Sequence, residues 1–228
     1  MMWTIEAILE KMSEAGASDL IITTAAPPQI RVLGSLQPIG TEHLTAADTE
    51  RLVTSLMTEE QLQQFKVTRT ADFSRGYSHL GRFRFNTFFQ RDAMGLVARL
   101  IPSVIPSFEE LGLPEIVRDF ALRPNGLVLI TGPAGSGKST TMAAMINYMN
   151  THRHLHVVCI EDPIEYLHTN RNSVVNQREI GEDAHSFSEA LRSVFRQSPD
   201  VVMIGELRDL ETMQLALTLA ETGHLILA

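Results

Sequence analysis

The sequence predicts an α/β protein in two parts, a small α+β domain followed by a domain built on a parallel sheet. Residues 1–101 mix helix and strand patterns and include Gly34-Ser35, a two-residue hairpin signal between two strand patterns. Prolines then recur between residues 102 and 124, and from residue 126 onward strand and helix patterns alternate. Such alternation is typical of parallel strands joined by helices. We expect a first domain over 1–101, a linker over 102–113 and a second domain over 114–228.

The first part should begin with an amphipathic helix that ends at Gly16. A long helix is predicted over 45–66, because Thr45-x-x-Asp48 matches a capping box at its start. Strands are predicted at 19–23, 29–33, 36–39, 71–74, 81–89 and 94–101. Together they predict an antiparallel sheet with helices.

In the second part, strands are predicted at 126–131, 156–160, 200–204 and 224–228. The helices between them are predicted at 139–150, 186–197 and 209–222. Ligands of parallel α/β sheets bind at the carboxyl ends of the strands, so the polar residues that follow each strand are candidate site residues.

Composition narrows the function classes. The formal net charge of -8 argues against broad nucleic-acid binding, and no apolar run approaches the roughly 18 residues of a membrane span. The N-terminus lacks the basic start of a signal peptide, so we expect a cytoplasmic protein. The single cysteine, Cys159, is predicted to be a core thiol. The alternating His152, His154 and His156 are interpreted as a half-exposed loop, since no second ligand cluster accompanies them.

The strongest motif fits G-x-x-x-x-G-K-[ST], the loop that holds nucleotide phosphates. It consists of Gly132, Pro133, Ala134, Gly135, Ser136, Gly137, Lys138, Ser139 and Thr140. A strand pattern precedes it and a helix pattern follows it, which is the context that the motif needs. Its glycines let backbone N–H groups point at phosphate oxygens. Lys138 supplies a charge for the β- and γ-phosphates of ATP, and Ser139 a hydroxyl for Mg²⁺. The alternative is an ordinary glycine turn with a surface lysine.

Carboxylates follow two other predicted strands. Glu161, Asp162 and Glu165 come after the strand that ends at Ile160, and Glu206 follows the strand over 200–204. Hydrolysis of ATP needs one carboxylate that orients water and one near the metal ion. Glu206 is placed for both roles, and Glu165 or Asp162 could assist it. Asp200 precedes its strand, so we expect it at the opposite edge. The alternative is that these acidic residues are solvated side chains in surface loops and helix caps.

Five segments together carry a resemblance: GPAGSGKSTT, IEDPIEY, VNQREIG, SFSEALRSVFRQSPDVVMIGELRDLETM and LTLAETGHL. Over nearly its whole length, the chain resembles the type IV pilus retraction ATPases of the secretion ATPase superfamily. The resemblance implies a PAS-like N-terminal domain, a RecA-like core and a homo-hexameric ring that binds ATP and Mg²⁺ between the two domains. It also implies a location at the cytoplasmic face of the bacterial inner membrane and contact with a pilus platform protein there.

The resemblance also suggests roles for single residues. Glu165 matches the second acidic residue of the Asp box, Glu206 the catalytic glutamate of an atypical Walker B motif, and His224 the first histidine of the His box. The arginines that approach the phosphates in this family correspond to Arg82 or Arg84 and to Arg99. The alternation of arginine and phenylalanine over 82–85 supports this, because it puts the charges on one strand face. A solvated face is the alternative for any one arginine.

The chain stops at Ala228, within the His box, so the resemblance implies a core truncated at its C-terminus. Three functions are compatible with these motifs. The first is a retraction motor for twitching motility. The second is a pilus assembly or type II secretion ATPase, which the single cysteine disfavours because such proteins carry a four-cysteine metal module. The third is an ATP-binding regulatory paralogue, which the presence of Lys138, Glu165 and Glu206 disfavours.

Overall fold

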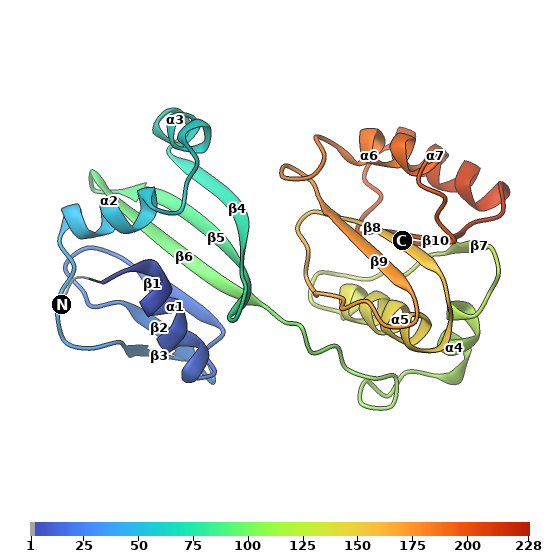
Figure 1. The fold of residues 1–228 in the computed structure, drawn as a ribbon, viewed down its shortest axis with the longest axis horizontal. Coiled ribbons are helices and arrows are strands. Elements are labelled where there is room, and N and C mark those ends of the chain that lie inside the picture. Colours follow the sequence, from blue (N-terminus) through green and yellow to red (C-terminus); the bar gives the residue numbers. More distant parts are fainter. Residues whose placement is uncertain (1–2) are drawn as a thin grey trace. The chain divides into compact units, whose positions relative to one another are not determined.

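The computed structural model describes residues 3–228, and the chain divides into two compact units, Met1–Ile101 and Pro102–Ala228 (Figure 1). Residues 102–113, which the sequence predicts to be a linker, fall within the second unit. Phe108 shows how they are attached, because its ring is buried in the core of that unit.

The first unit is a six-stranded sheet with helices. Its strands run antiparallel in the order β3-β2-β1-β6-β5-β4. The elements are α1 (Ile5–Glu14), β1 (Asp19–Ile22), β2 (Gln29–Val32), β3 (Ser35–Pro38), α2 (Ala46–Thr54), α3 (Glu59–Thr68), β4 (Thr70–Tyr77), β5 (Gly81–Gln90) and β6 (Ala93–Ile101). The hairpin between β2 and β3 turns at Leu33 and Gly34, one residue earlier than predicted, and both residues have positive φ as a type I′ turn requires.

The two faces of this sheet differ in character. Alternate residues of β5, Phe83 and Phe85, point into a core that they share with the apolar sides of α1, α2 and α3. The residues that alternate with these phenylalanines therefore lie on the other face: Arg82, Arg84 and Asn86. The predicted alternation of rings and charges on this strand is confirmed.

The single long helix predicted over 45–66 is wrong. Thr45 does form the capping box with Asp48 that the sequence indicates, but a second capping box, between Thr58 and Gln61, starts a new helix. Residues 55–57 form the turn that separates α2 from α3. The apolar period continues across this turn, and for that reason the pattern alone suggested one helix.

The second unit is a five-stranded parallel sheet in the order β7-β11-β10-β8-β9. The elements are α4 (Glu115–Ala121), β7 (Gly126–Val128), α5 (Lys138–His152), β8 (His156–Glu161), β9 (Val174–Glu179), α6 (Phe187–Val194), β10 (Val201–Ile204), α7 (Leu210–Glu221) and β11 (Leu225–Leu227). The parallel sheet that the sequence predicts is confirmed, but α4 and the edge strand β9 were not foreseen.

Helices cover both faces of this sheet (Figure 1). Val157 and Cys159 of β8 face α4 and α5, whereas Val158 and Ile160 face α6 and α7. The prediction that Cys159 is a core thiol is confirmed, and burial raises the pKa of this thiol well above its ordinary value. A parallel sheet covered on both sides leaves its strand ends as the places where polar groups can gather.

The strand order separates the strand before the glycine loop from the strands that precede the carboxylates. The strand that leads into the glycine loop, β7, is not adjacent to β10 or β8, because β11 lies between β7 and β10. All five strands are parallel, so their carboxyl ends still share one rim.

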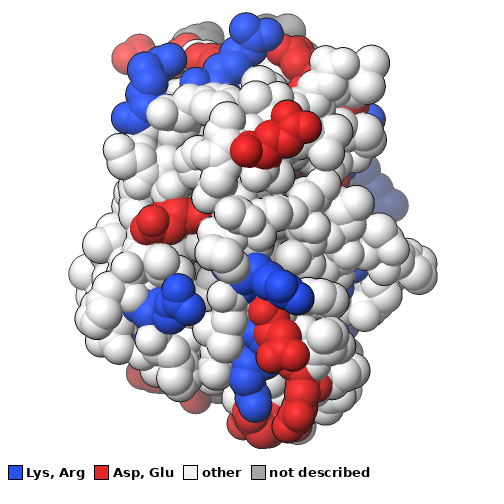
Figure 2. All heavy atoms as spheres, turned by 90° about the vertical axis from the view of Figure 1, so that its right-hand side faces the viewer, with Lys and Arg blue, Asp and Glu red and all other residues white. Residues whose placement is uncertain are grey.

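β7 is an edge strand, and the surface around it is poor in charge. On this side of the second unit, broad uncharged areas separate the acidic and basic side chains (Figure 2). The exposed large apolar side chains of α4, of α7 and of the residue after β7 are Ile116, Phe120, Leu210, Met213, Leu217 and Leu129. Among residues 3–228, no helix has the length and apolar character needed to cross a bilayer.

Candidate functional site

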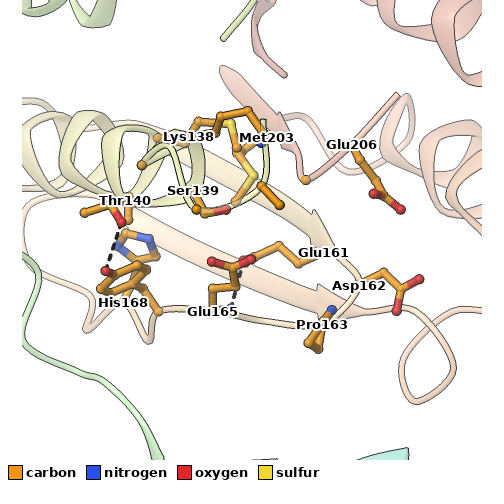
Figure 3. A pocket seen from close by; sticks show the side chains of 17 residues that line it. Lys138, Ser139, Thr140, Glu161, Asp162, Pro163, Glu165, His168, Met203 and Glu206 are labelled. Carbon is orange, nitrogen blue, oxygen red and sulfur yellow. Dashed lines mark hydrogen bonds between the residues drawn. The ribbon is translucent and has the colours of Figure 1, made fainter. Parts of the chain in front are cut away.

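A pocket of about 380 Å³ lies at the carboxyl end of the parallel sheet. Its volume falls within the range of about 300–1,000 Å³ that small-molecule sites occupy. Its lining comes from the second unit alone: the glycine loop, the first turns of α5, the segment after β8 and the end of β10 (Figure 3). The structure thus brings the predicted phosphate loop together with the carboxylates that follow the strands.

The glycine loop has the backbone that an anion site requires. Gly135 and Gly137 have φ angles of 76° and 93°, a region that favours glycine. Gly137 caps α5, and no side chain accepts a hydrogen bond from the first N–H groups of this helix. Its first turn also holds no acidic residue. The helix therefore presents unneutralised N–H groups to the pocket, which suits phosphate oxygens.

Lys138 is folded back over the loop. Its Nζ donates to the carbonyl oxygens of Gly132 at 2.9 Å and Pro133 at 3.0 Å. These oxygens hold the ammonium inside the loop, where an anion bound to the N–H groups would also meet it. Ser139 and Thr140 follow on the first turn of α5, and both line the pocket.

Two carboxyl groups, those of Glu161 and Glu165, lie side by side across from Ser139 (Figure 3). Glu161 is the last residue of β8 and is only 6% exposed, whereas Glu165 is exposed in the pocket. Burial raises the pKa of Glu161 to about 7, helped by the charges of Glu165 and Glu179 and opposed by hydrogen bonds from Gln177 and from the Glu165 backbone. Glu161 therefore titrates near neutral pH inside a site that its neighbours make acidic.

Glu206 lies farther along the rim, two residues after β10, and it is half-buried. Its Oε1 lies 2.6 Å from Nε of Arg208, so an arginine neutralises it in this arrangement. Asp200 lies at the other end of the strand, where its carboxylate accepts a hydrogen bond from the His156 N–H at 2.7 Å. The expectation that Asp200 lies at the opposite edge is confirmed.

Two pocket residues with polar rings, His168 and Tyr166, were not predicted from the sequence. Burial lowers the pKa of His168 to about 4, so its imidazole is neutral at pH 7. The Tyr166 hydroxyl lies 3.1 Å from Oγ1 of Thr140 and links the segment after β8 to the start of α5. Both belong to the irregular chain after β8, where periodicity gives no signal. Their only sequence signal is that they follow the acidic strand end.

His224 is not among the residues that line this pocket. It precedes β11, so it lies at the amino end of the sheet, where its carbonyl oxygen accepts from the Gly126 N–H at 3.0 Å. Its Nδ1 lies 3.0 Å from the Leu219 oxygen and 3.2 Å from Oγ1 of Thr222. A residue that precedes a parallel strand lies away from the rim at the carboxyl ends of the strands, so the catalytic role of His224 stays a prediction.

The three alternating histidines do not share one loop, because His152 ends α5 and His156 begins β8, and they have separate partners. Nδ1 atoms of His152, His154 and His156 contact the carbonyl oxygens of Tyr148, Asn172 and Ser198 respectively. Within residues 3–228, no group of three or more His, Cys, Asp or Glu side chains is arranged to hold a metal ion.

The predicted arginines lie on the sheet of the first unit. Arg84 of β5 is directly opposite Arg99 of β6, and Arg82 lies two residues along β5. Nε of Arg99 donates to Oδ1 of Asp19 at 2.8 Å, and Arg84 lies 3.6 Å from Oδ1 of Asp72. Directly opposed residues of antiparallel strands project from the same face. Arg84 and Arg99 therefore form a basic pair on the face that the helices do not cover.

Known proteins share this architecture. A family model described as type II/IV secretion system protein matches residues 2–228. The chain is 45% identical over 98% of its length to the type IV pilus ATPase PilU of Pseudomonas aeruginosa, and 45% identical over 97% of its length to the pilus retraction ATPase PilT of the same bacterium. A crystal structure of the pilus retraction motor PilT with bound ADP matches it with a TM-score of 0.92 at 44% identity.

The match to that crystal structure covers 99% of this chain and 66% of the PilT chain. The chain spans 58% of the length of PilU and 64% of the length of PilT in the sequence comparisons. Because the family model matches nearly all of its residues, the chain belongs to the family of type II/IV secretion system proteins.

Proposed function

We propose that this protein binds ATP with Mg²⁺ and hydrolyses it as a motor for type IV pilus retraction. One observation carries the proposal: the glycine loop and Lys138 share a pocket with Glu165 and Glu206. That combination offers donors for phosphates and carboxylates for water on one rim. The solved PilT structure holds ADP, and another relative, from Neisseria gonorrhoeae, is named a twitching motility protein; both names support the proposal.

Each pocket residue has a task in this proposal. The loop N–H groups and Lys138 hold the phosphates, and Glu206, assisted by Glu165, orients the attacking water and accepts its proton. Mg²⁺ takes oxygen ligands and is commonly held by one or two side chains together with substrate phosphates, which the Ser139 hydroxyl and the Glu206 carboxylate fit. The ion, when bound, neutralises developing charge on the phosphates.

The remaining parts of the proposal concern the assembly. Arg82, Arg84 and Arg99, on a first unit of PAS-like type, supply further positive charge to the phosphates that the RecA-like second unit binds. Identical chains form a hexameric ring at the cytoplasmic face of the inner membrane, where the ring acts on a pilus platform protein. The identity to PilT and to the structure of a retraction motor supports this part.

A second candidate is an accessory pilus ATPase, since the identity to PilU equals the identity to PilT at 45%. A pilus assembly or type II secretion ATPase is the more distant alternative. Deletion of the gene separates these functions. A retraction motor predicts cells with excess pili and no twitching, whereas unchanged twitching would favour an accessory role.

The chemical proposal is tested with Glu206→Ala. Loss of the carboxylate should lower ATP turnover by about 100-fold or more and leave nucleotide affinity unchanged, because the phosphates are held by the loop. Glu211→Ala is the matched control, since Glu211 is an exposed carboxylate on α7 that lies outside the pocket. Equal turnover in the Glu206→Ala variant and the wild type would refute the assignment.

A further inference from the structure

The segment between β8 and β9 carries Glu165, yet its backbone is irregular from residue 162 to residue 173. A catalytic carboxylate must be held within a fraction of an ångström of its working position. Neither a helix nor a strand provides that support here. The segment is instead held by contacts with neighbouring elements, among them Asn150 of α5 and side chains of the adjacent strands.

Gln177 of β9 makes three hydrogen bonds to this region. Its Nε2 donates to the Tyr166 carbonyl oxygen at 2.7 Å and to Oε1 of Glu161 at 3.0 Å. Its Oε1 accepts from the His168 N–H at 2.9 Å. The orientation of the amide is determined by these partners, because a flipped amide would face two acceptors with its oxygen and a donor with its nitrogen.

Glu161 continues the same network toward Glu165. Its second oxygen, Oε2, accepts from the Glu165 backbone N–H at 3.3 Å. Gln177 and Glu161 together thus hold backbone groups of residues 165, 166 and 168. Register places Gln177 opposite Cys159, so Gln177 and Glu161 project from the same face of the sheet, toward α5.

A contact on the far side of the segment complements this network. The Tyr166 hydroxyl meets Oγ1 of Thr140 at 3.1 Å, on the first turn of α5. The segment is therefore tied to β9 through its backbone and to the phosphate loop through a side chain. Gln177 is not needed for the pairing of β8 with β9, which extends over six backbone register pairs.

We propose that Gln177 is a positioning residue that fixes Glu165 against the bound nucleotide, through Glu161 and the backbone of Tyr166 and His168. The inference rests on the proposed ATP hydrolysis. Gln177 does not line the pocket. Its contribution should thus affect turnover rather than nucleotide binding.

The test is Gln177→Met, which keeps the length of the side chain and removes its hydrogen bonds. We expect kcat to fall by about 10- to 100-fold while KM stays within about 2-fold, as for a misplaced catalytic group. Asn176→Met is the matched control, because Asn176 is the adjacent residue of β9 and bonds His156 at the amino end of β8 instead. This control should keep wild-type kcat.

A double variant asks whether Gln177 acts through Glu165. In a Glu165→Ala background, Gln177→Met should cause little further loss of kcat, because the group that it positions is gone. An undiminished loss in that background would overturn the inference. If Gln177→Met fails to fold, Gln177→Glu replaces it, since Gln177→Glu keeps the acceptor for the His168 N–H and loses both donors.

Amide hydrogen exchange separates failure of this inference from failure of the proposed function. Wild-type protein that does not hydrolyse ATP refutes the proposed function. Active wild type with unchanged kcat in Gln177→Met refutes the positioning role alone. In either case the exchange rates of the Glu165 and His168 N–H groups report on the network directly. Faster exchange in Gln177→Met, with no change in Asn176→Met, supports it, and equal rates overturn it.

Discussion

Asp19 in the first unit and Glu161 in the second are both carboxylic acids at 6% exposure, yet their pKa values shift in opposite directions. Burial by itself would raise the pKa of Asp19, but hydrogen bonds from Ser18 and Arg99 and the charges of Arg99 and Arg31 hold it below its ordinary value. Among the described residues, no cation contributes to the shift of Glu161, so burial raises its pKa to about 7. The sign of each shift depends on whether hydrogen bonds and opposite charges outweigh the effect of burial.

The difference extends to the surfaces around the two residues. Register places Arg31, Asp19, Arg99 and Arg84 in one row across β2, β1, β6 and β5 of the first unit. The rim of the second unit instead combines one lysine with several carboxylates. A basic sheet face suits an anion, and a carboxylate rim beside a phosphate loop suits a phosphate that carries a metal ion.

The largest effect should come from the phosphate loop. Lys138→Ala removes the charge that the loop carbonyls hold in place. Nucleotide affinity should fall by about 10- to 100-fold, as expected for a charged hydrogen bond to phosphate. Calorimetry with ADP measures this. Lys66→Ala, at the end of α3 in the first unit, is the control. Unchanged affinity in Lys138→Ala would refute the phosphate-loop interpretation.

The basic pair of the first unit gives the next prediction. Arg84→Ala and Arg99→Ala should each lower ATP turnover by about 10-fold, since an arginine near the transferred phosphate stabilises charge in the transition state. Steady-state ATPase assays of the intact protein measure the effect. Arg91→Ala is the matched control, because Arg91 lies in the turn between β5 and β6. Wild-type turnover in both variants would favour the alternative of a solvated face.

The sequence predicted features that depend on local chemistry. The glycine loop could be recognised because glycines at 135 and 137 determine the backbone and α5 begins immediately afterwards. The strand ends could be recognised because apolar runs stop at acidic residues. The Gln177–Glu161 network could not, because it joins residues that are 16 positions apart and depends on the pairing of β8 with β9. The location of His224 at the amino end of the sheet likewise depends on strand direction, which only the fold reveals.

The raised pKa of Glu161 predicts that the stability of the protein depends on pH. Its pKa is raised from 4.5 to about 7, so the folded state binds the proton more tightly than the unfolded state does. The free energy of unfolding should therefore fall as pH rises from about 4.5 to about 7, by on the order of 3 kcal/mol at most. Glu161→Gln should remove most of this slope.

Urea denaturation at about pH 5 and about pH 8 measures the slope for both proteins. Glu221→Gln, at the exposed end of α7, should keep the wild-type slope. If Glu161→Gln and wild type lose the same stability over this range, Glu161 is not the group that titrates, and the contrast with Asp19 disappears.

Asp19 gives the smallest effect, with the opposite sign. Its pKa lies below the ordinary 3.8, so its stabilising contribution is complete at neutral pH and is lost as pH falls through the folded-state value. Asp19→Asn should cost about 1 kcal/mol at neutral pH, because Arg99 is largely exposed and water screens the pair. The difference from wild type should narrow below about pH 4 and in high salt. Asp72→Asn, whose carboxylate meets Arg84 at 3.6 Å and is 52% exposed, should cost less. A cost for Asp19→Asn that does not change with pH or salt would mean that packing, and not the flanking arginines, distinguishes Asp19 from Glu161.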